Sequence, residues 1–140
     1  MPQRILLVVL LGASCCMLHG CKPSYQQETA PVTGTVTLDG KPLTGGGVMF
    51  QPKSGRGAIG EIGPDGTYSL RTYGSNDGAS IGLHQVAVLG GAPANEEEAK
   101  SFKPLQIPSH YSGAESSGLA FEVKPGVDNV FNIELTTDTN

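Results

Sequence analysis

The thiols are the reactive side chains whose positions say most about this sequence. Cys15, Cys16 and Cys21 all lie within the first 21 of the 140 residues, and no cysteine follows them. A disulfide or a thiolate metal site is therefore excluded from the rest of the chain. Whatever chemistry these thiols perform belongs to the amino terminus.

The amino terminus has the pattern of a secretory signal. Arg4 precedes a short apolar run over residues 5–11, and small residues follow before Cys21. A basic start, an apolar region and a small residue before a cleavage site are typical of a signal peptide. The run is shorter than the roughly 20 apolar residues that span a bilayer. We therefore predict a signal peptide over residues 1–20.

The end of this segment predicts a lipid anchor. The residues Leu18-His19-Gly20-Cys21 resemble the bacterial lipobox, in which the signal is cut before a cysteine that becomes diacylated, although His19 departs from the usual small residue. The other two cysteines fit less well, because neither has leucine three positions before it. Acyl chains on Cys21 would hold the protein on a membrane of the bacterial cell envelope, outside the cytoplasm. Ordinary secretion and an uncleaved anchor are the alternatives.

Residues 21–31 are predicted to be a flexible tether. They are polar and carry proline near both ends, a composition typical of a linker. An ordered first strand in this segment is the alternative.

The remaining chain has few side chains suited to catalysis. His84 shares a strand face with Val86 and Val88, which indicates a packed histidine, and His110 stands in a loop beside Tyr111. Two histidines need carboxylates to complete a zinc site, and no motif for a nucleophilic serine or a phosphate-cradling loop is present. We predict no catalytic residues, no metal, no cofactor and no enzyme activity.

Tyrosines are the best candidates for ligand contacts in a chain without tryptophan. The predicted contacts are Tyr73, Tyr111 and His110, and the two phenol rings are suited to stacking on a sugar. Calcium held by turn aspartates is a weaker alternative, since the D-x-D-x-D-G spacing is absent.

The net charge of −4 argues against nucleic acid as a partner, because such binding needs a basic patch. The expected partners are the membrane, through the lipid on Cys21, and an unknown envelope protein or glycan.

Short strands separated by turns must position these residues. Over residues 32–38 Val, Gly, Val and Leu alternate with threonines, the sign of a half-buried strand, and Asp39-Gly40 ends it with turn chemistry. Similar segments are residues 48–52, 58–62, 67–72, 83–89, 119–123 and 131–135. Seven short strands predict an all-β protein, an antiparallel Greek-key β-sandwich over residues 32–136, followed by a frayed tail at 137–140.

The alternation also predicts the core, from residues that share one strand face: Val36, Leu38, Val48, Phe50, Tyr68, Leu70, Val86, Val88, Leu119, Phe121, Phe131, Ile133 and Leu135. Between the fifth and sixth strands, Asn95 and Glu98 form a capping-box pattern, which predicts at most one short helix near 95–101. A disordered loop is the alternative there.

The order of these motifs resembles a known family. VTGTVTLDGKPLTGGGVMF, GPDGTYSLRT, GLHQVAV, IPSHYS and SGLAFEVKPG follow one another as in the carboxypeptidase regulatory-like, or transthyretin-like, domains. The resemblance covers residues 32–135 and implies a seven-stranded sandwich of the prealbumin type, which occurs in many short bacterial surface lipoproteins. It implies no particular activity.

The family also contains an enzyme, 5-hydroxyisourate hydrolase, to which this chain is similar in expected fold only. That enzyme needs clustered histidines, an arginine and a Tyr-Arg-Gly-Ser tail, whereas this chain ends in TTDTN. The sequence therefore favours a non-enzymatic, lipid-anchored structural or protein-interaction module. A small carbohydrate-binding surface domain is the alternative.

Overall fold

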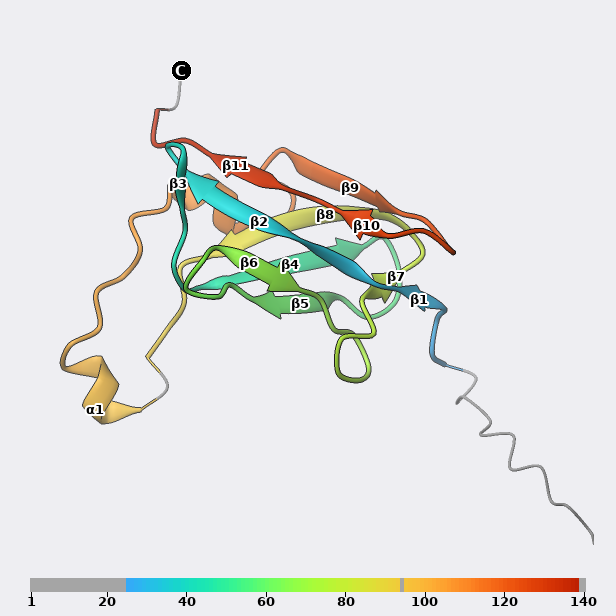
Figure 1. The fold of residues 1–140 in the computed structure, drawn as a ribbon, viewed down its shortest axis with the longest axis horizontal. Helices are drawn as coiled ribbons and strands as arrows, with labels where there is room; N and C mark the ends of the chain where they lie inside the picture. The colour runs from blue at the N-terminus through green and yellow to red at the C-terminus, as the bar shows by residue number, and fades with distance from the viewer. Residues whose placement is uncertain (1–24, 94, 139–140) are drawn as a thin grey trace, which may run out of the picture.

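Figure 1 shows a computed structural model of the protein, which describes residues 25–93 and 95–138. The predicted signal peptide, Cys21 and the first part of the predicted tether lie outside the described residues. The strands of the described part are β1 (Thr29–Ala30), β2 (Val32–Leu38), β3 (Lys41–Pro42), β4 (Gly47–Pro52), β5 (Ala58–Glu61), β6 (Thr67–Ser69), β7 (Ala79–Ser80), β8 (Gly82–Leu89), β9 (Leu119–Val123), β10 (Asn129–Val130) and β11 (Ile133–Leu135).

The strands form two larger sheets and one small one. One larger sheet has the order β5-β4-β8-β9, and the other is built around β2, which pairs with β3, β6, β10 and β11. Strands β1 and β7 form the small sheet. In Figure 1 the β2 layer lies over the β4, β5 and β8 layer, and one apolar cluster draws its residues from both. The protein is therefore all-β in its framework, as the alternation predicted.

The core follows the predicted parity. Val36, Val48, Phe50, Tyr68, Leu70, Val86, Val88, Ile133 and Leu135 are buried, whereas Leu38, Leu119, Phe121 and Phe131 are partly buried and pack against them. Phe50 is fully buried and meets the rings of Phe121 and Phe131 edge-on, with centroids 6.0 and 6.1 Å apart. Alternation works here because successive strand residues point to opposite faces and only one face meets the other sheet.

The predicted seven antiparallel strands differ from what is observed. The described residues contain eleven strands in three sheets, and both β10 and β11 run parallel to β2. A parallel neighbour needs a long crossover connection, and here most of the domain separates the two partners. The additional strands β1, β3, β7 and β10 have two residues each, too few for alternation to reveal.

Asn132 lies between β10 and β11, and only β11 falls within the predicted last strand, residues 131–135. Its side-chain Oδ1 accepts hydrogen bonds from the Thr35 backbone N–H, at 3.1 Å, and from the Thr35 hydroxyl, at 3.0 Å. A side chain thus occupies the place of a backbone carbonyl in the ladder with β2, and pairing resumes at Ile133.

The chain changes sheets after β6, which the predicted strand 67–72 did not anticipate. Residues Thr67–Ser69 pair with β2, but Arg71 pairs with Ile59 of β5 in the other sheet. The Ile59 N–H donates to the Arg71 carbonyl at 3.0 Å, and the Arg71 N–H donates to the Ile59 carbonyl at 2.9 Å. This bridge joins the two layers along one edge.

The helix prediction is confirmed as one exposed turn, α1 (Glu96–Ala99), whose first amides are capped by Asn95. The Asn95 side chain accepts a hydrogen bond from the Glu98 N–H at 2.9 Å. A single 3-10 turn, η1 (Ser109–Ser112), was not predicted. Within residues 25–93 and 95–138 no helix has the length and apolar content needed to cross a bilayer.

Order begins earlier than the predicted boundary at Val32. Strand β1 pairs with β7, and Ala30 is part of the buried core. The carboxyl end of the predicted tether is therefore an ordered strand, which the sequence had left open as the alternative. Pairing with β7 supplies the hydrogen bonds that a two-residue strand cannot make alone.

Candidate functional site

The structure places the three predicted ligand contacts at two separate sites. Tyr111 and His110 lie together on η1, with ring centroids 3.9 Å apart, and the Tyr111 hydroxyl accepts a hydrogen bond from the Thr136 N–H at 3.3 Å. Tyr111 is partly buried against the core, so its ring serves to hold the carboxyl-terminal strand. Tyr73 lies elsewhere, on the loop that follows β6.

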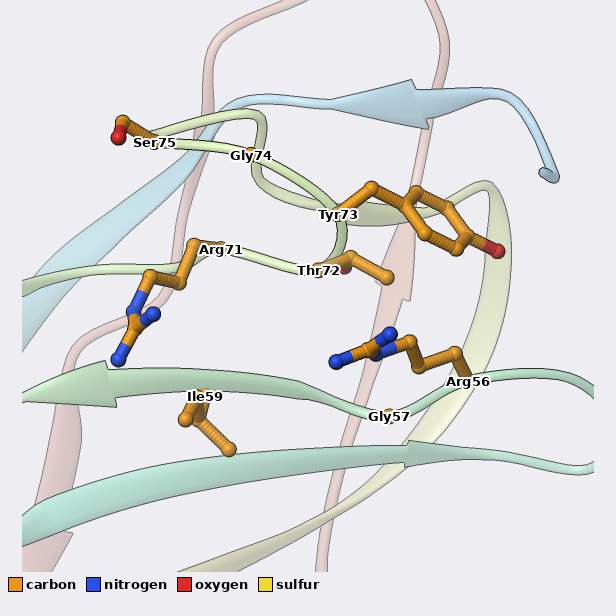
Figure 2. Close-up of a pocket in the computed structure, with 8 residues that line it drawn as sticks. All are labelled: Arg56, Gly57, Ile59, Arg71, Thr72, Tyr73, Gly74 and Ser75. Carbon is orange, nitrogen blue, oxygen red and sulfur yellow. The ribbon is translucent and has the colours of Figure 1, made fainter. Parts of the chain in front are cut away.

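Tyr73 lines a hollow of about 470 Å³ between β5 and that loop. Its walls are Arg56, Gly57 and Ile59 on one side and residues 71–75 on the other. Figure 2 shows the Arg56 and Arg71 side chains over β5, with the Arg56 guanidinium extending beneath Thr72 and Tyr73 in this view. We call this the arginine hollow.

The bridge between the sheets positions Arg71. Both the N–H and the carbonyl of Arg71 are hydrogen-bonded to the backbone of Ile59, so the Cα of Arg71 is held beside β5. Its side chain remains exposed. Arg71 also lines two adjoining hollows, one with Ser69 and Asn76 and one with Leu89 and Gly47. A ligand at Arg71 therefore has a more polar hollow on one side of it and a mainly apolar hollow on the other.

Neither guanidinium of the arginine hollow is neutralised by an acidic residue. In the described ranges the sole ion pair is that of Lys100 with Glu97 on α1, and neither Arg56 nor Arg71 has a hydrogen-bonded side-chain partner. Glu61 lies along the adjoining hollows without forming an ion pair with Arg71. Two exposed cations thus face one concavity in an otherwise acidic chain.

Asp77 holds the loop that carries the other wall. Its Oδ1 accepts from the Thr72 N–H at 2.8 Å, and its Oδ2 accepts from the N–H groups of Tyr73 and Gly74 at 2.8 and 3.0 Å. Partial burial acts to raise the pKa of Asp77, but the backbone hydrogen bonds outweigh it and hold the pKa below the ordinary value. The Thr72 hydroxyl closes the loop by donating to the Gly78 carbonyl at 2.7 Å.

Gln27, near the start of the described residues, supports Tyr73 from outside the hollow. The Gln27 N–H donates to the Tyr73 hydroxyl oxygen at 3.2 Å, and the Gln27 side chain lies directly against Gly55. The phenol ring is therefore held at the rim of the hollow, with its own hydroxyl proton available to a ligand.

His84 is a core residue, as its strand face indicated. It is fully buried against Phe50, with ring centroids 5.7 Å apart, and its Nε2 donates to the Ser80 carbonyl at 2.7 Å. Its Nδ1 is buried without a hydrogen-bond partner in the described part of the chain. His84 lines none of the walls of the arginine hollow.

The site offers binding groups and no reactive pair. No group of three or more His, Cys, Asp or Glu side chains that could hold a metal ion occurs in the described residues. The two arginines were not among the predicted contacts. The signal that could have found them is composition, since they are the only arginines that follow Arg4.

Comparison with family models, with curated proteins and with solved structures found no match for this chain.

Proposed function

We propose that this protein is a non-enzymatic binding module of the bacterial cell envelope, anchored by a lipid on Cys21, and that it holds an anionic group in the arginine hollow. The observation that carries the proposal is the placement of Arg56 and Arg71 on one concavity without an acidic partner. A guanidinium presents a planar fork of N–H donors that matches a carboxylate or phosphate in charge and geometry.

Both arginines are free to accept such a ligand at low cost. Because neither guanidinium is bound to a side chain among the described residues, an incoming anion has no ion pair with those residues to displace. The hollow is open to solvent, so the interaction is screened by salt, whose Debye length is about 8 Å at 0.15 M. We therefore expect binding in the millimolar range for a single small anion, falling as ionic strength rises.

The architecture supports this function through the rigidity of its frame. Arg71 is fixed by two backbone hydrogen bonds to β5, and the facing loop is fixed by three bonds to Asp77. A site on a preorganised backbone loses little entropy when a ligand arrives. The non-enzymatic part of the proposal is supported by the donors of the hollow, since guanidinium groups bind anions.

The proposal also covers the family. We propose that the domain is a variant of the transthyretin-like sandwich, in which two-residue strands are added to the seven longer ones. The support is that each of the seven predicted segments contains a strand. The alternating segments that resemble the family form these strands, and the Gly63-Pro64-Asp65-Gly66 motif forms the turn between β5 and β6.

An acidic sugar is the second candidate ligand. Tyr73 at the rim would stack on a pyranose ring while the arginines hold its carboxylate, which joins the predicted carbohydrate contact to the observed cations. Glucuronate is therefore one of the anions to be compared.

The test is a titration of the mature protein with inorganic phosphate, glucuronate and neutral glucose, followed by the chemical shifts of the backbone amides around Thr72. We expect both anions to bind and glucose not to bind. Arg56→Gln with Arg71→Gln should weaken anion binding at least tenfold, while Lys103→Gln, which removes one positive charge from an exposed loop, should change nothing. Equal binding by the double variant, or no binding of either anion, would overturn the proposal.

A further inference from the structure

The first described residues of the chain lie against the arginine hollow. Gln27 contacts Tyr73, which lines the hollow, and Gly55, which directly precedes the wall residue Arg56. The Ile81 N–H donates to the Glu28 carbonyl at 3.0 Å. Residue 27 is therefore fixed beside the hollow by hydrogen bonds to the folded domain.

Covalent geometry then limits the distance between the hollow and the predicted anchor. Cys21 precedes Gln27 by six residues. A chain extends by at most about 3.6 Å per residue, so the two positions are separated by no more than about 20 Å. Acyl chains on Cys21 would lie in the hydrocarbon layer. The headgroup region adds several ångströms on each side of that layer. The arginine hollow is thus within reach of the headgroups.

We propose that the arginine hollow binds the phosphate of anionic phospholipid headgroups in the membrane that carries the Cys21 anchor. This inference rests on the proposed function, because it identifies the anion and uses the lipid on Cys21. The phosphodiester of such a headgroup carries one negative charge on two free oxygens, which suits a guanidinium fork. Free phosphate shares this chemistry, and the experiment below separates the two sources.

The surface around the hollow also suits the interface of a bilayer. Ile59, which lines the hollow, is 48% exposed, and Tyr25, two residues before Gln27, is 74% exposed. Tyrosine rings are favoured at the level of lipid headgroups. These side chains would contact the boundary between headgroups and acyl chains while the arginines hold phosphates.

Because acidic residues lie near the hollow, we expect the arginines to orient the domain on the bilayer and not to attach it. Glu28 and Glu61 are exposed near the hollow, and the whole chain is acidic, so the domain alone would gain little affinity for an anionic surface. The acyl chains supply attachment. One basic residue near an anionic surface raises the ratio of membrane-facing to other orientations about fivefold, and two raise it about thirtyfold. The hollow therefore decides which face of the domain lies on the bilayer.

The mature acylated protein provides a clean labelling site for the test. Once the signal peptide is removed and Cys21 is acylated, Ser54→Cys introduces the single free thiol, two positions from Arg56 and outside the walls of the hollow. Asp138→Cys is the matched position, three residues after β11, whose carboxyl end pairs with the end of β2 that is remote from β1 (Figure 1). Each thiol is labelled with bimane.

The labelled proteins are reconstituted into vesicles of phosphatidylcholine, with or without phosphatidylglycerol, that contain brominated lipids as contact quenchers. With phosphatidylglycerol we expect strong quenching at position 54 and little at position 138. Removing phosphatidylglycerol, or introducing Arg56→Gln with Arg71→Gln, should reduce quenching at position 54 severalfold, and Lys103→Gln should not. Melting curves of the double variant verify that it folds.

Several results would overturn the inference. Equal quenching at the two positions, or unchanged quenching in the double variant, would show that the hollow does not face the headgroups. A mass spectrum without acyl chains on Cys21 would remove its premise. If free phosphate binds in the titration but position 54 is not quenched, the anion site stands and the lipid assignment fails. If neither is observed, both fail.

Discussion

Replacing Asp77 is the sharpest test of how the loop of the arginine hollow is held. Its carboxylate accepts three backbone N–H groups from consecutive residues, at 2.8, 2.8 and 3.0 Å. A hydrogen bond to a charged group contributes about 1.5–3 kcal/mol in general. Two of the three bonds are partly buried and the third is exposed, so water replaces part of the loss. We expect Asp77→Ala to lower the free energy of unfolding by about 2–3 kcal/mol.

The pH dependence of the free energy of unfolding provides a second, independent test of the same contact. Because the folded pKa of Asp77 lies below its ordinary value of 3.8, the folded state favours the charged carboxylate. The stabilisation is therefore complete above the unfolded pKa and is lost as pH falls through the folded pKa. Asp77→Asn keeps the shape but not the charge. Its deficit relative to the natural protein should be largest at pH 7 and should shrink below pH 3.8.

Urea unfolding followed by circular dichroism at pH 7 and at pH 2.5 measures both effects. Asp39 and Asp65 also have lowered pKa values through hydrogen bonds with Thr137 and Thr67, so the natural protein as a whole loses stability in acid. The difference between the natural protein and Asp77→Asn isolates one carboxylate from the others. A deficit that is equal at the two pH values, or a neutral Asp77→Ala, would refute the reasoning.

Three further predictions concern the framework. Phe50→Ala empties a fully buried position and should lower the free energy of unfolding by about 3–5 kcal/mol. Phe121 is partly exposed, so Phe121→Ala should lower it clearly less. Equal losses in urea unfolding would contradict this. Tyr68→Phe removes a 2.7 Å hydrogen bond to the carbonyl that precedes Asn132 and should cost about 1 kcal/mol, so an unchanged melting temperature would contradict it. Gly78→Ala places a methyl group against the backbone of Ala30 in β1, at a φ of 77°. It should lower the melting temperature far more than Gly40→Ala, because Gly40 has the same φ but open space around it. Similar melting temperatures would show that the contact with β1 does not matter.

The alternating pattern was sufficient to predict most of the β framework. Each of the seven predicted segments contains a strand, and Val36 of β2 and the predicted inward residues of β4 and β8 are buried as expected. The turn at Asp39-Gly40 was also readable, since both residues adopt positive φ there. These features are local, because a strand face and a tight turn depend on the side chains within a few residues.

The topology was harder to predict because it depends on pairs far apart in the chain. The parallel pairing of β11 with β2 and the hydrogen bonds between Asn132 and Thr35 both require contacts across about a hundred residues. The sequence shows asparagine there as one polar residue among several. Only its proximity to Thr35 makes it an element of the ladder.

The sequence alone determined the β-rich class, the inward strand faces, the turns and the confinement of cysteine to the amino terminus. The tertiary structure decided the site. Arg56 and Arg71 are fifteen positions apart with no shared motif, and they meet because the chain leaves one sheet after β6 and pairs with β5 of the other. Alternation encodes which side of a strand faces the core, whereas the meeting of two exposed side chains depends on how the sheets join.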